Sequence, residues 1–440
     1  MKTSQYNFIM SNGTQGYIMY NTNSDMLLGI NQTLLDLFQQ YRNNIDSLQE
    51  IHHDFYDILC QKGFLIDDNV DETESLIKKW NEEENNEKRL SLIINPTLDC
   101  NFRCWYCYEE HKNIMNMTQE VRKAISHFLQ KQCTIPEREY IGLSFFGGEP
   151  LLMFDDVVMP LVHDLHSFCK TNEKSYSIGF TTNGYLLTPK VVDQLKEAAN
   201  CNIFFQITLD GNRAMHDKTR FAHETRDGSY DTIITNIKYA ISNGCSLCIR
   251  LNYTPKNITS FIDILDDLDE IKSYDNYHID FQRVWQTRNA QDISLEVTQV
   301  KETFRNRGLK VSMDSASNKT HCYADYKNNF VINYNGNVYK CTARDFKDEN
   351  RKGILTPEGD IIMDEAYNRC IQHKYERKAC MDCIIFPICH AGCIQHKLEH
   401  PSNDTCLRGY STDNIRNVIT ERILNILAPS PKEEKACENS

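Results

Sequence analysis

The sequence predicts an α/β protein: a partial (β/α)6, TIM-like barrel, with a winged-helix-like domain before it and a cysteine-rich domain after it. Between residues 90 and 300, apolar and β-branched runs alternate with helical patterns, which is typical of parallel βα units. Short alternating segments precede this region, and clustered cysteines follow it. Six βα units are fewer than the eight of a closed barrel, so the barrel should be partial.

Residues 1–66 are expected to form the winged-helix-like domain. Alternating apolar residues predict three short strands, at 6–11, 17–20 and 26–30. Asn31 is placed to cap a first helix, two further helices follow, and Gly63 should end the last of them before a final strand. This order resembles the peptide-recognition elements at the front of enzymes that modify ribosomally made peptides, and it would then bind a leader segment. A structural cap and a DNA-binding domain are the alternatives, and the few Lys and Arg on these helices disfavour DNA.

The rest of the chain follows in four parts. The expected boundaries are an acidic linker at 67–89, the barrel at 90–300, the cysteine-rich domain at 301–410 and a C-terminal helix and tail at 411–440. The barrel strands are expected at 90–95, 140–146, 176–182, 203–209, 247–253 and 278–284. The helices between them are expected at 118–131, 154–169, 189–199, 231–242 and 258–271.

Three cysteines, Cys100, Cys104 and Cys107, lie on the loop after the first barrel strand. Three thiolates on one short loop can hold three irons of a [4Fe–4S] cluster and leave the fourth iron open. A zinc loop is the alternative, but zinc uses four ligands in paired spacings, and no fourth Cys or His follows at such a spacing. The spacing, with Tyr106 before the third cysteine, resembles the radical S-adenosylmethionine (SAM) enzymes. In them the open iron chelates SAM, which is cleaved to a 5′-deoxyadenosyl radical.

Further motifs follow the next strands in the order expected for this superfamily. A Gly-Gly-Glu-Pro segment follows the second strand, and in the family it binds the SAM amino group. Arg250, on the fifth strand, is a candidate partner for the SAM carboxylate or ribose, with a barrel-core or surface role as the alternative. The candidate SAM-binding residues are Tyr106, Gly147, Gly148, Glu149, Asn183, Thr208 and Arg250.

Seven more cysteines lie at ordered intervals between residues 322 and 406. Their spacing resembles the SPASM domain that follows the barrel in many radical SAM enzymes, which implies two auxiliary [4Fe–4S] clusters. By this resemblance Cys322, Cys341 and Cys393 bind the first cluster, and Cys380, Cys383, Cys389 and Cys406 bind the second. The first cluster then has either an open iron or a distant fourth ligand such as Cys370. Two zinc sites are the alternative. A hairpin with a primed turn at Asn335-Gly336 is expected just before Cys341.

The net charge of −13 argues against a nucleic-acid partner. The N-terminus lacks a signal peptide and no apolar stretch is long enough for a membrane span, so a cytoplasmic enzyme without a membrane partner is expected. The resemblance implies three [4Fe–4S] clusters, SAM, and an electron donor such as flavodoxin or ferredoxin.

The expected function is hydrogen abstraction from a ribosomally synthesised precursor peptide with a leader, to install a thioether or carbon–carbon crosslink. The sequence assigns no catalytic base. Sulfatase maturation is a weaker candidate, because Thr342 stands where those relatives place an aspartate after the second SPASM cysteine. The chain could instead be a peptide epimerase, an iron–sulfur electron-transfer protein or a zinc-dependent DNA regulator.

Overall fold

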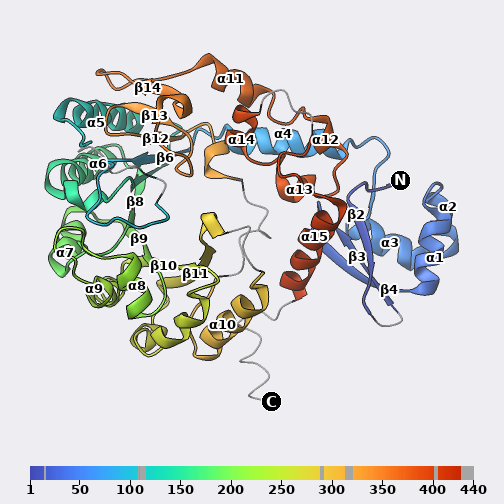
Figure 1. Ribbon diagram of the computed structural model, residues 1–440. Coiled ribbons are helices and arrows are strands. Elements are labelled where there is room, and N and C mark those ends of the chain that lie inside the picture. The colour runs from blue at the N-terminus through green and yellow to red at the C-terminus, as the bar shows by residue number, and fades with distance from the viewer. Residues whose placement is uncertain are drawn as a thin grey trace. The chain divides into compact units, whose positions relative to one another are not determined.

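The computed structural model describes residues 1–13, 16–107, 109, 115–287, 292–312, 321–400 and 405–427 (Figure 1). The chain divides into two compact units. The first unit comprises residues 1–85, 313–326 and 366–440, and the second comprises residues 86–312 and 327–365. The expected C-terminal tail, from residue 428, lies outside the described residues. The N-terminal domain and most of the cysteine-rich region therefore belong to one compact unit.

The second unit is built on six parallel strands that lie side by side in chain order. They are β6 (Arg89–Ile94), β7 (Tyr140–Phe145), β8 (Ser175–Thr182), β9 (Asn202–Leu209), β10 (Ser246–Tyr253) and β11 (Tyr277–Arg283). Consecutive parallel strands joined by helices are the repeating unit of a βα barrel, so the predicted fold class is confirmed. β12 (Asn329–Ile332) pairs in parallel with β6, and β13 (Asn337–Tyr339), β14 (Gly353–Leu355) and β15 (Ile361–Met363) extend that edge.

Helices cover the outer side of this curved sheet (Figure 1). They are α5 (Gln119–Thr134), α6 (Met159–Thr171), α7 (Pro189–Ala198), α8 (Arg213–Thr219) and α9 (Tyr230–Ser242), and α10 (Ser294–Asn306) follows β11. The helix predicted at 258–271 is instead two 3₁₀ helices, Ile258–Ile264 and Asp269–Ser273. The buried residues Ile258, Phe261 and Ile264 recur every third position, which fits three residues per turn.

The two faces of the sheet differ in chemistry. One face is apolar and fully buried, with the rings of Phe145, Phe180 and Phe205 stacked at centroid distances of 5.1 and 5.2 Å. The alternate residues of these strands include the partly buried polar side chains of Ser144 and Thr181, together with Phe204. The inner face of the barrel therefore offers polar groups beside an aromatic ring to a ligand.

In the first unit, three antiparallel strands precede three helices, as predicted. The strands are β2 (Asn7–Ser11), β3 (Gly16–Asn21) and β4 (Met26–Asn31), and the helices are α1 (Gln32–Tyr41), α2 (Asp46–Ile51) and α3 (His53–Gln61). Asn31 caps α1 by accepting a hydrogen bond from the Leu34 amide at 3.0 Å. Gly63 follows α3 with a left-handed φ of +77°. β1 (Lys2–Thr3) pairs with β5 (Leu65–Ile66), and α4 (Glu72–Glu84) lies in the segment interpreted as a linker.

The cysteine-rich part of the first unit is made of short helices. They are α11 (Glu365–Gln372), α12 (Lys378–Met381), α13 (Phe386–Cys389) and α14 (Ile394–Glu399), followed by the longer α15 (Thr412–Leu427). Three successive residues, His390, Ala391 and Gly392, are left-handed, with φ of +51°, +59° and +83°. The left-handed conformation costs about 1–2 kcal/mol at a residue with a side chain. The His390 ring stacks on His321 at a centroid distance of 4.2 Å, which helps to hold this turn.

The hairpin before Cys341 is present, but its predicted primed turn is wrong. A primed turn of type I′ needs positive φ at both central residues, whereas Gly336 has φ of +81° and Asn335 is not left-handed. The Gly336 amide instead donates to the Asn333 carbonyl at 2.9 Å. Gly336 thus serves as the left-handed residue after the turn.

Among the described residues, every helix is too short or too polar to span a lipid bilayer.

Candidate functional site

The loop after β6 carries the first three cysteines and is held by its own polar groups. The Asp99 carboxylate accepts hydrogen bonds from the Cys100 amide at 2.8 Å and from the Arg103 guanidinium at 3.2 Å. The Cys107 amide donates to the Cys104 carbonyl at 3.0 Å, which closes a turn between these two cysteines. The three thiols are thus carried by a short, internally bonded loop at the carboxyl end of β6, where βα barrels place their chemistry.

The surroundings of the three thiols fit an iron–sulfur cluster. Burial raises the pKa of the Cys100 and Cys104 thiols, and it raises the pKa of Cys107 to about 11. The negative charges of Glu149, Cys104 and Cys107 raise the pKa of Cys100 further. Three neighbouring thiolates in such a site need a compensating positive charge, and bound iron supplies it.

Gly147 and Gly148 lie directly against the backbone of the cysteine loop. A Cβ atom on Gly147 would come within 2.3 Å of the Thr97 carbonyl oxygen, and one on Gly148 within 2.0 Å of the Asp99 carbonyl oxygen. The Gly148 amide donates to the Thr97 carbonyl at 3.0 Å, and the Glu149 amide donates to the Asp99 carbonyl at 2.8 Å. Only glycine permits this approach, so the two glycines position the cysteine loop.

The Glu149 side chain is fully buried and joins two strand ends. Its carboxylate accepts hydrogen bonds from the Thr182 hydroxyl at 2.7 Å, the Asn183 amide at 2.8 Å and the Leu151 amide at 3.1 Å. Burial raises the pKa of Glu149 to about 7. Asn183 in turn donates from its side chain to Asn101 at 2.7 Å. Glu149 and Asn183 therefore lie beside the cysteine loop, and their contact with SAM stays a prediction.

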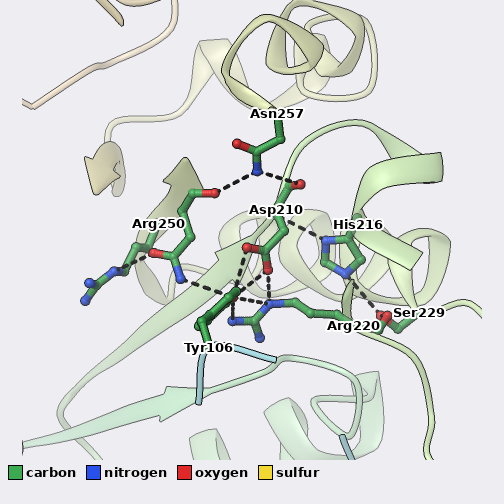
Figure 2. A network of polar contacts seen from close by, with 8 residues as sticks. Tyr106, Asp210, His216, Arg220, Ser229, Arg250 and Asn257 are labelled. Atoms are coloured by element: carbon green, nitrogen blue, oxygen red, sulfur yellow. Dashed lines mark hydrogen bonds and ion pairs between the residues drawn. The ribbon is translucent and has the colours of Figure 1, made fainter. Parts of the chain in front are cut away.

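Tyr106 is the centre of a buried polar network at the ends of β9 and β10 (Figure 2). Its hydroxyl donates to the Asp210 carboxylate, with distances of 2.9 and 2.7 Å to the two oxygens. It accepts from Arg220 at 2.6 and 3.1 Å and from the Asn252 side chain at 3.2 Å. Arg220 also forms an ion pair with Asp210. This network fixes the aromatic ring that lies between the second and third cysteines.

His216 supports the network from behind. The Asp210 amide donates to His216 Nδ1 at 3.3 Å, and His216 Nε2 lies 3.0 Å from the Ser229 hydroxyl, which donates to the Arg220 carbonyl at 2.8 Å (Figure 2). Burial, with the charge of Arg220, lowers the pKa of His216 to about 3. The imidazole is therefore neutral near pH 7, accepts at Nδ1 and donates at Nε2.

Thr208 and Arg250 are register partners on β9 and β10, so their side chains lie on the same face of the sheet. Arg250 donates from Nε to the Asn252 side chain at 3.0 Å. Figure 2 shows its two terminal nitrogens pointing away from the Asp210–Arg220 pair. Asn252 thus links Arg250 to Tyr106 by hydrogen bonds. The terminal nitrogens of Arg250 point away from the Tyr106 network.

Four of the later cysteines gather in the first unit. Burial raises the pKa of Cys380 to about 11, and the charges of Cys389, Cys383 and Cys406 raise it further. Among the described residues, no three of these sulfurs lie within 4.8 Å of one another, so they are farther apart than the ligands of one zinc ion and suit the larger [4Fe–4S] cluster better. Cys322 and Cys393 belong to the first unit and Cys341 to the second, and the cluster predicted for these three stays a prediction.

A family model described as the radical SAM superfamily matches residues 94–268, which contain the cysteine loop, the Gly-Gly-Glu segment and the Tyr106 network. These residues therefore form a radical SAM domain. The chain is also 26% identical over 365 residues to a cysteine-type anaerobic sulfatase-maturating enzyme from Clostridium novyi (strain NT), and the match covers 72% of this chain and 91% of that relative.

Two solved structures share the fold. SuiB of Streptococcus suis with bound S-adenosylmethionine has a TM-score of 0.53 and 16% identity, covering 92% of this chain and 98% of that one. The anSMEcpe enzyme with bound AdoMet and the Kp18Cys peptide has a TM-score of 0.58 and 17% identity, covering 77% of this chain and 99% of that one.

Reasoning from the sequence assigned no role at this site to four of its residues: Asp210, His216, Arg220 and Asn252. A signal was present for three of them, because Asp210 ends a barrel strand and His216 and Arg220 follow it within ten residues. Asn252 lies two positions after Arg250 on the same strand and therefore on the same face. Polar residues at the carboxyl ends of barrel strands are the general signal.

Proposed function

We propose that this radical SAM protein is a peptide maturase that removes hydrogen from a ribosomally synthesised precursor peptide and installs a thioether or carbon–carbon crosslink. One observation carries the proposal. A radical SAM domain and a second group of four cysteines occur in a chain whose first sixty-six residues contain a three-stranded sheet followed by three helices. Both solved neighbours have also been determined with a bound peptide: SuiB with the precursor peptide SuiA, and anSMEcpe with the Cp18Cys peptide.

Each part of the barrel site has a role in this proposal. Cys100, Cys104 and Cys107 hold a [4Fe–4S] cluster, which when bound supplies the electron for the cleavage of SAM. Gly147 and Gly148 keep the cysteine loop in place, and Glu149 holds the end of β8 beside it. Tyr106 is locked by Asp210 and Arg220, so the loop keeps one shape when SAM arrives. Arg250 has guanidinium nitrogens directed away from this network and is the residue we assign to the SAM carboxylate.

The sheet of the N-terminal part limits where a leader segment could bind. One face of the β2-β3-β4 sheet packs on α1–α3, and the other packs on α15 and the segment around Ile385. With both faces covered, an extended peptide can add only along an edge strand, which is β2 or β4. Strand addition supplies main-chain hydrogen bonds whatever the sequence of the peptide.

The low-potential electron comes from a flavodoxin or ferredoxin in the reducing cytoplasm.

Sulfatase maturation is the second candidate, because the Clostridium novyi relative bears that name. Thr342 stands where an acidic residue is expected for that reaction, and this favours crosslinking.

The two candidates are separated by one experiment. The protein is reconstituted with iron and sulfide under anaerobic conditions and given SAM, dithionite and either of two probes. One probe is a synthetic peptide encoded by a small open reading frame next to the gene, and the other is a cysteine-containing sulfatase peptide. Loss of two hydrogens from the first probe, seen by mass spectrometry, supports crosslinking. Replacement of the cysteine by formylglycine in the second probe would overturn it.

A further inference from the structure

The sheet of the N-terminal domain forms one side of the second auxiliary-cysteine site. Tyr20 of β3 packs in one apolar cluster with Ile385 and Ile388, which lie between Cys383 and Cys389. Cys383 and Cys389 are themselves partly buried against that cluster. α15 closes it with Ile419 and Ile423, both almost fully buried.

A buried hydrogen bond fastens the sheet to the cysteine segment. The Thr22 hydroxyl, at the end of β3, donates to the Ile384 carbonyl at 2.5 Å, and Thr22 has no exposed surface. Ile384 directly follows Cys383, so this bond fixes the backbone beside a candidate ligand. A second set of bonds holds α15 against the sheet: Arg422 of this helix contacts Asp25 at 2.6 Å and the Tyr20 hydroxyl at 3.0 Å.

We propose that the N-terminal sheet is the supporting wall of the second auxiliary-cluster site, and that Thr22 is a positioning residue for the segment from Cys383 to Cys389. The inference rests on the proposed function, in which Cys380, Cys383, Cys389 and Cys406 hold that cluster.

The physical reason is preorganisation. The segment from Cys383 to Cys389 contains only one short helix, α13, and a four-residue helix has little stability of its own. Its shape therefore comes from what it packs against: the sheet contacts Ile385 and Ile388, and the rings of Trp80 and Tyr375 contact Phe386. Groups that orient metal ligands from outside the ligand set commonly set the affinity of a site. The leader-binding domain is then also part of the cluster site.

The test compares Thr22→Val with Thr22→Ser in full-length, anaerobically reconstituted protein. Valine keeps the shape of threonine and removes the hydroxyl, whereas serine keeps the hydroxyl. Thr3→Val is the control, because the Thr3 hydroxyl also donates to a main-chain carbonyl in the N-terminal domain, that of Arg42 at 3.2 Å, and neither residue belongs to the apolar clusters beside the cysteines. The measurements are the rate of iron release to a chelator and the EPR spectrum and midpoint potential of the reduced clusters.

Thr22→Val should release the iron of one cluster about fivefold faster, the factor that corresponds to one lost buried hydrogen bond. One EPR component should shift, while Thr22→Ser and Thr3→Val behave as the wild type. A wild-type release rate and spectrum for Thr22→Val would overturn the inference. If that variant does not fold, Tyr20→Phe is the second variant, since it loses the contacts to Asp25 and Arg422 but keeps the ring; unchanged iron release there would equally overturn it.

Cys406→Ala distinguishes a failure of the supporting wall from a failure of the cluster assignment. A loss of about four iron in Cys406→Ala, without faster release in Thr22→Val, would contradict only the supporting wall. Unchanged iron in Cys406→Ala would contradict the cluster assignment itself, and the inference with it.

Discussion

The two cysteine sites of this chain are held in different ways. In the barrel, Cys100, Cys104 and Cys107 lie on a loop against which Gly147 and Gly148 pack, backbone to backbone, and the next strand ends bond directly to that loop. In the second site, the segment from Cys383 to Cys389 is shaped by a sheet that lies far away in the sequence. The barrel site is thus held by contacts within its own fold, whereas the auxiliary site is held by contacts with another domain.

The largest expected effect breaks the barrel site outright. Replacing Cys100, Cys104 and Cys107 together by alanine should abolish formation of 5′-deoxyadenosine, because no second set of three cysteines follows a barrel strand in the sequence. The product is measured by chromatography after anaerobic incubation with SAM and dithionite. Cys60→Ala, a change at a scattered cysteine in the N-terminal domain, is the control and should retain the activity. Substantial SAM cleavage by the triple variant would contradict the assignment.

A single methyl group should test the backbone contact that distinguishes the barrel site. In Gly148→Ala the new Cβ would lie 2.0 Å from the Asp99 carbonyl oxygen, so the cysteine loop must move. We expect SAM cleavage to fall more than about tenfold, since a displacement of about 1 Å at a reacting centre can cost far more than that. Gly29→Ala is the control, because nothing lies within 4 Å of its added Cβ. Equal activity of both variants would show that the contact is not needed.

The Tyr106 network should have a large effect on stability. Arg220→Met leaves the buried Asp210 carboxylate without its cation, and we expect a loss of about 3 kcal/mol in the free energy of unfolding. Tyr106→Phe removes hydrogen bonds but leaves the ion pair, so about 1 kcal/mol is expected. Denaturant unfolding of the two single variants and the double variant gives the coupling between the residues. Strict additivity of the two effects would mean that Tyr106 and Arg220 do not act as one unit.

The smallest effect concerns pH. The pKa of His216 is lowered to about 3 in the folded protein, against about 6.5 in the unfolded chain. The unfolded chain therefore binds more protons between these values, and the stability present above pH 6.5 is lost as the pH falls toward 3. At pH 5 the loss should be about 2 kcal/mol. His216→Gln should flatten this dependence, measured as the melting temperature between pH 8 and pH 5. A wild-type slope in the variant would assign the acid sensitivity to other groups.

Much of the barrel could be predicted from the sequence because its signals are local. Apolar runs located the six strands, and the order of motifs after them placed the cysteine loop beside the Gly-Gly-Glu segment. Asn31 was recognised as a cap because a cap depends on the next three residues. The turn near Gly336 was misassigned, since a left-handed glycine suits a primed turn and a turn followed by a bulge equally well. The stretch at 258–271 was assigned as one helix because its apolar spacing does not distinguish two 3₁₀ helices from an α-helix.

The contacts between distant segments could not be predicted. Tyr106 and Asp210 lie 104 positions apart, and Thr22 and Ile384 lie 362 positions apart. No local pattern marks such a pair, because each residue is compatible with the strand or turn in which it lies. Only folding of the chain brings the two residues together. The division of the chain between the two units has the same origin.

The left-handed turn at His390, Ala391 and Gly392 joins Cys389 to Cys393, and its cost has a consequence for how the protein matures. Without metal, the stacking of the His390 ring is opposed by the unfavourable left-handed backbone conformations of His390 and Ala391. The turn is therefore expected to open readily. Metal loading and the last step of folding then become a single equilibrium for this segment. In hydrogen–deuterium exchange, the amides of residues 389–393 should be among the first to exchange in iron-free protein and should become protected as iron and sulfide are added.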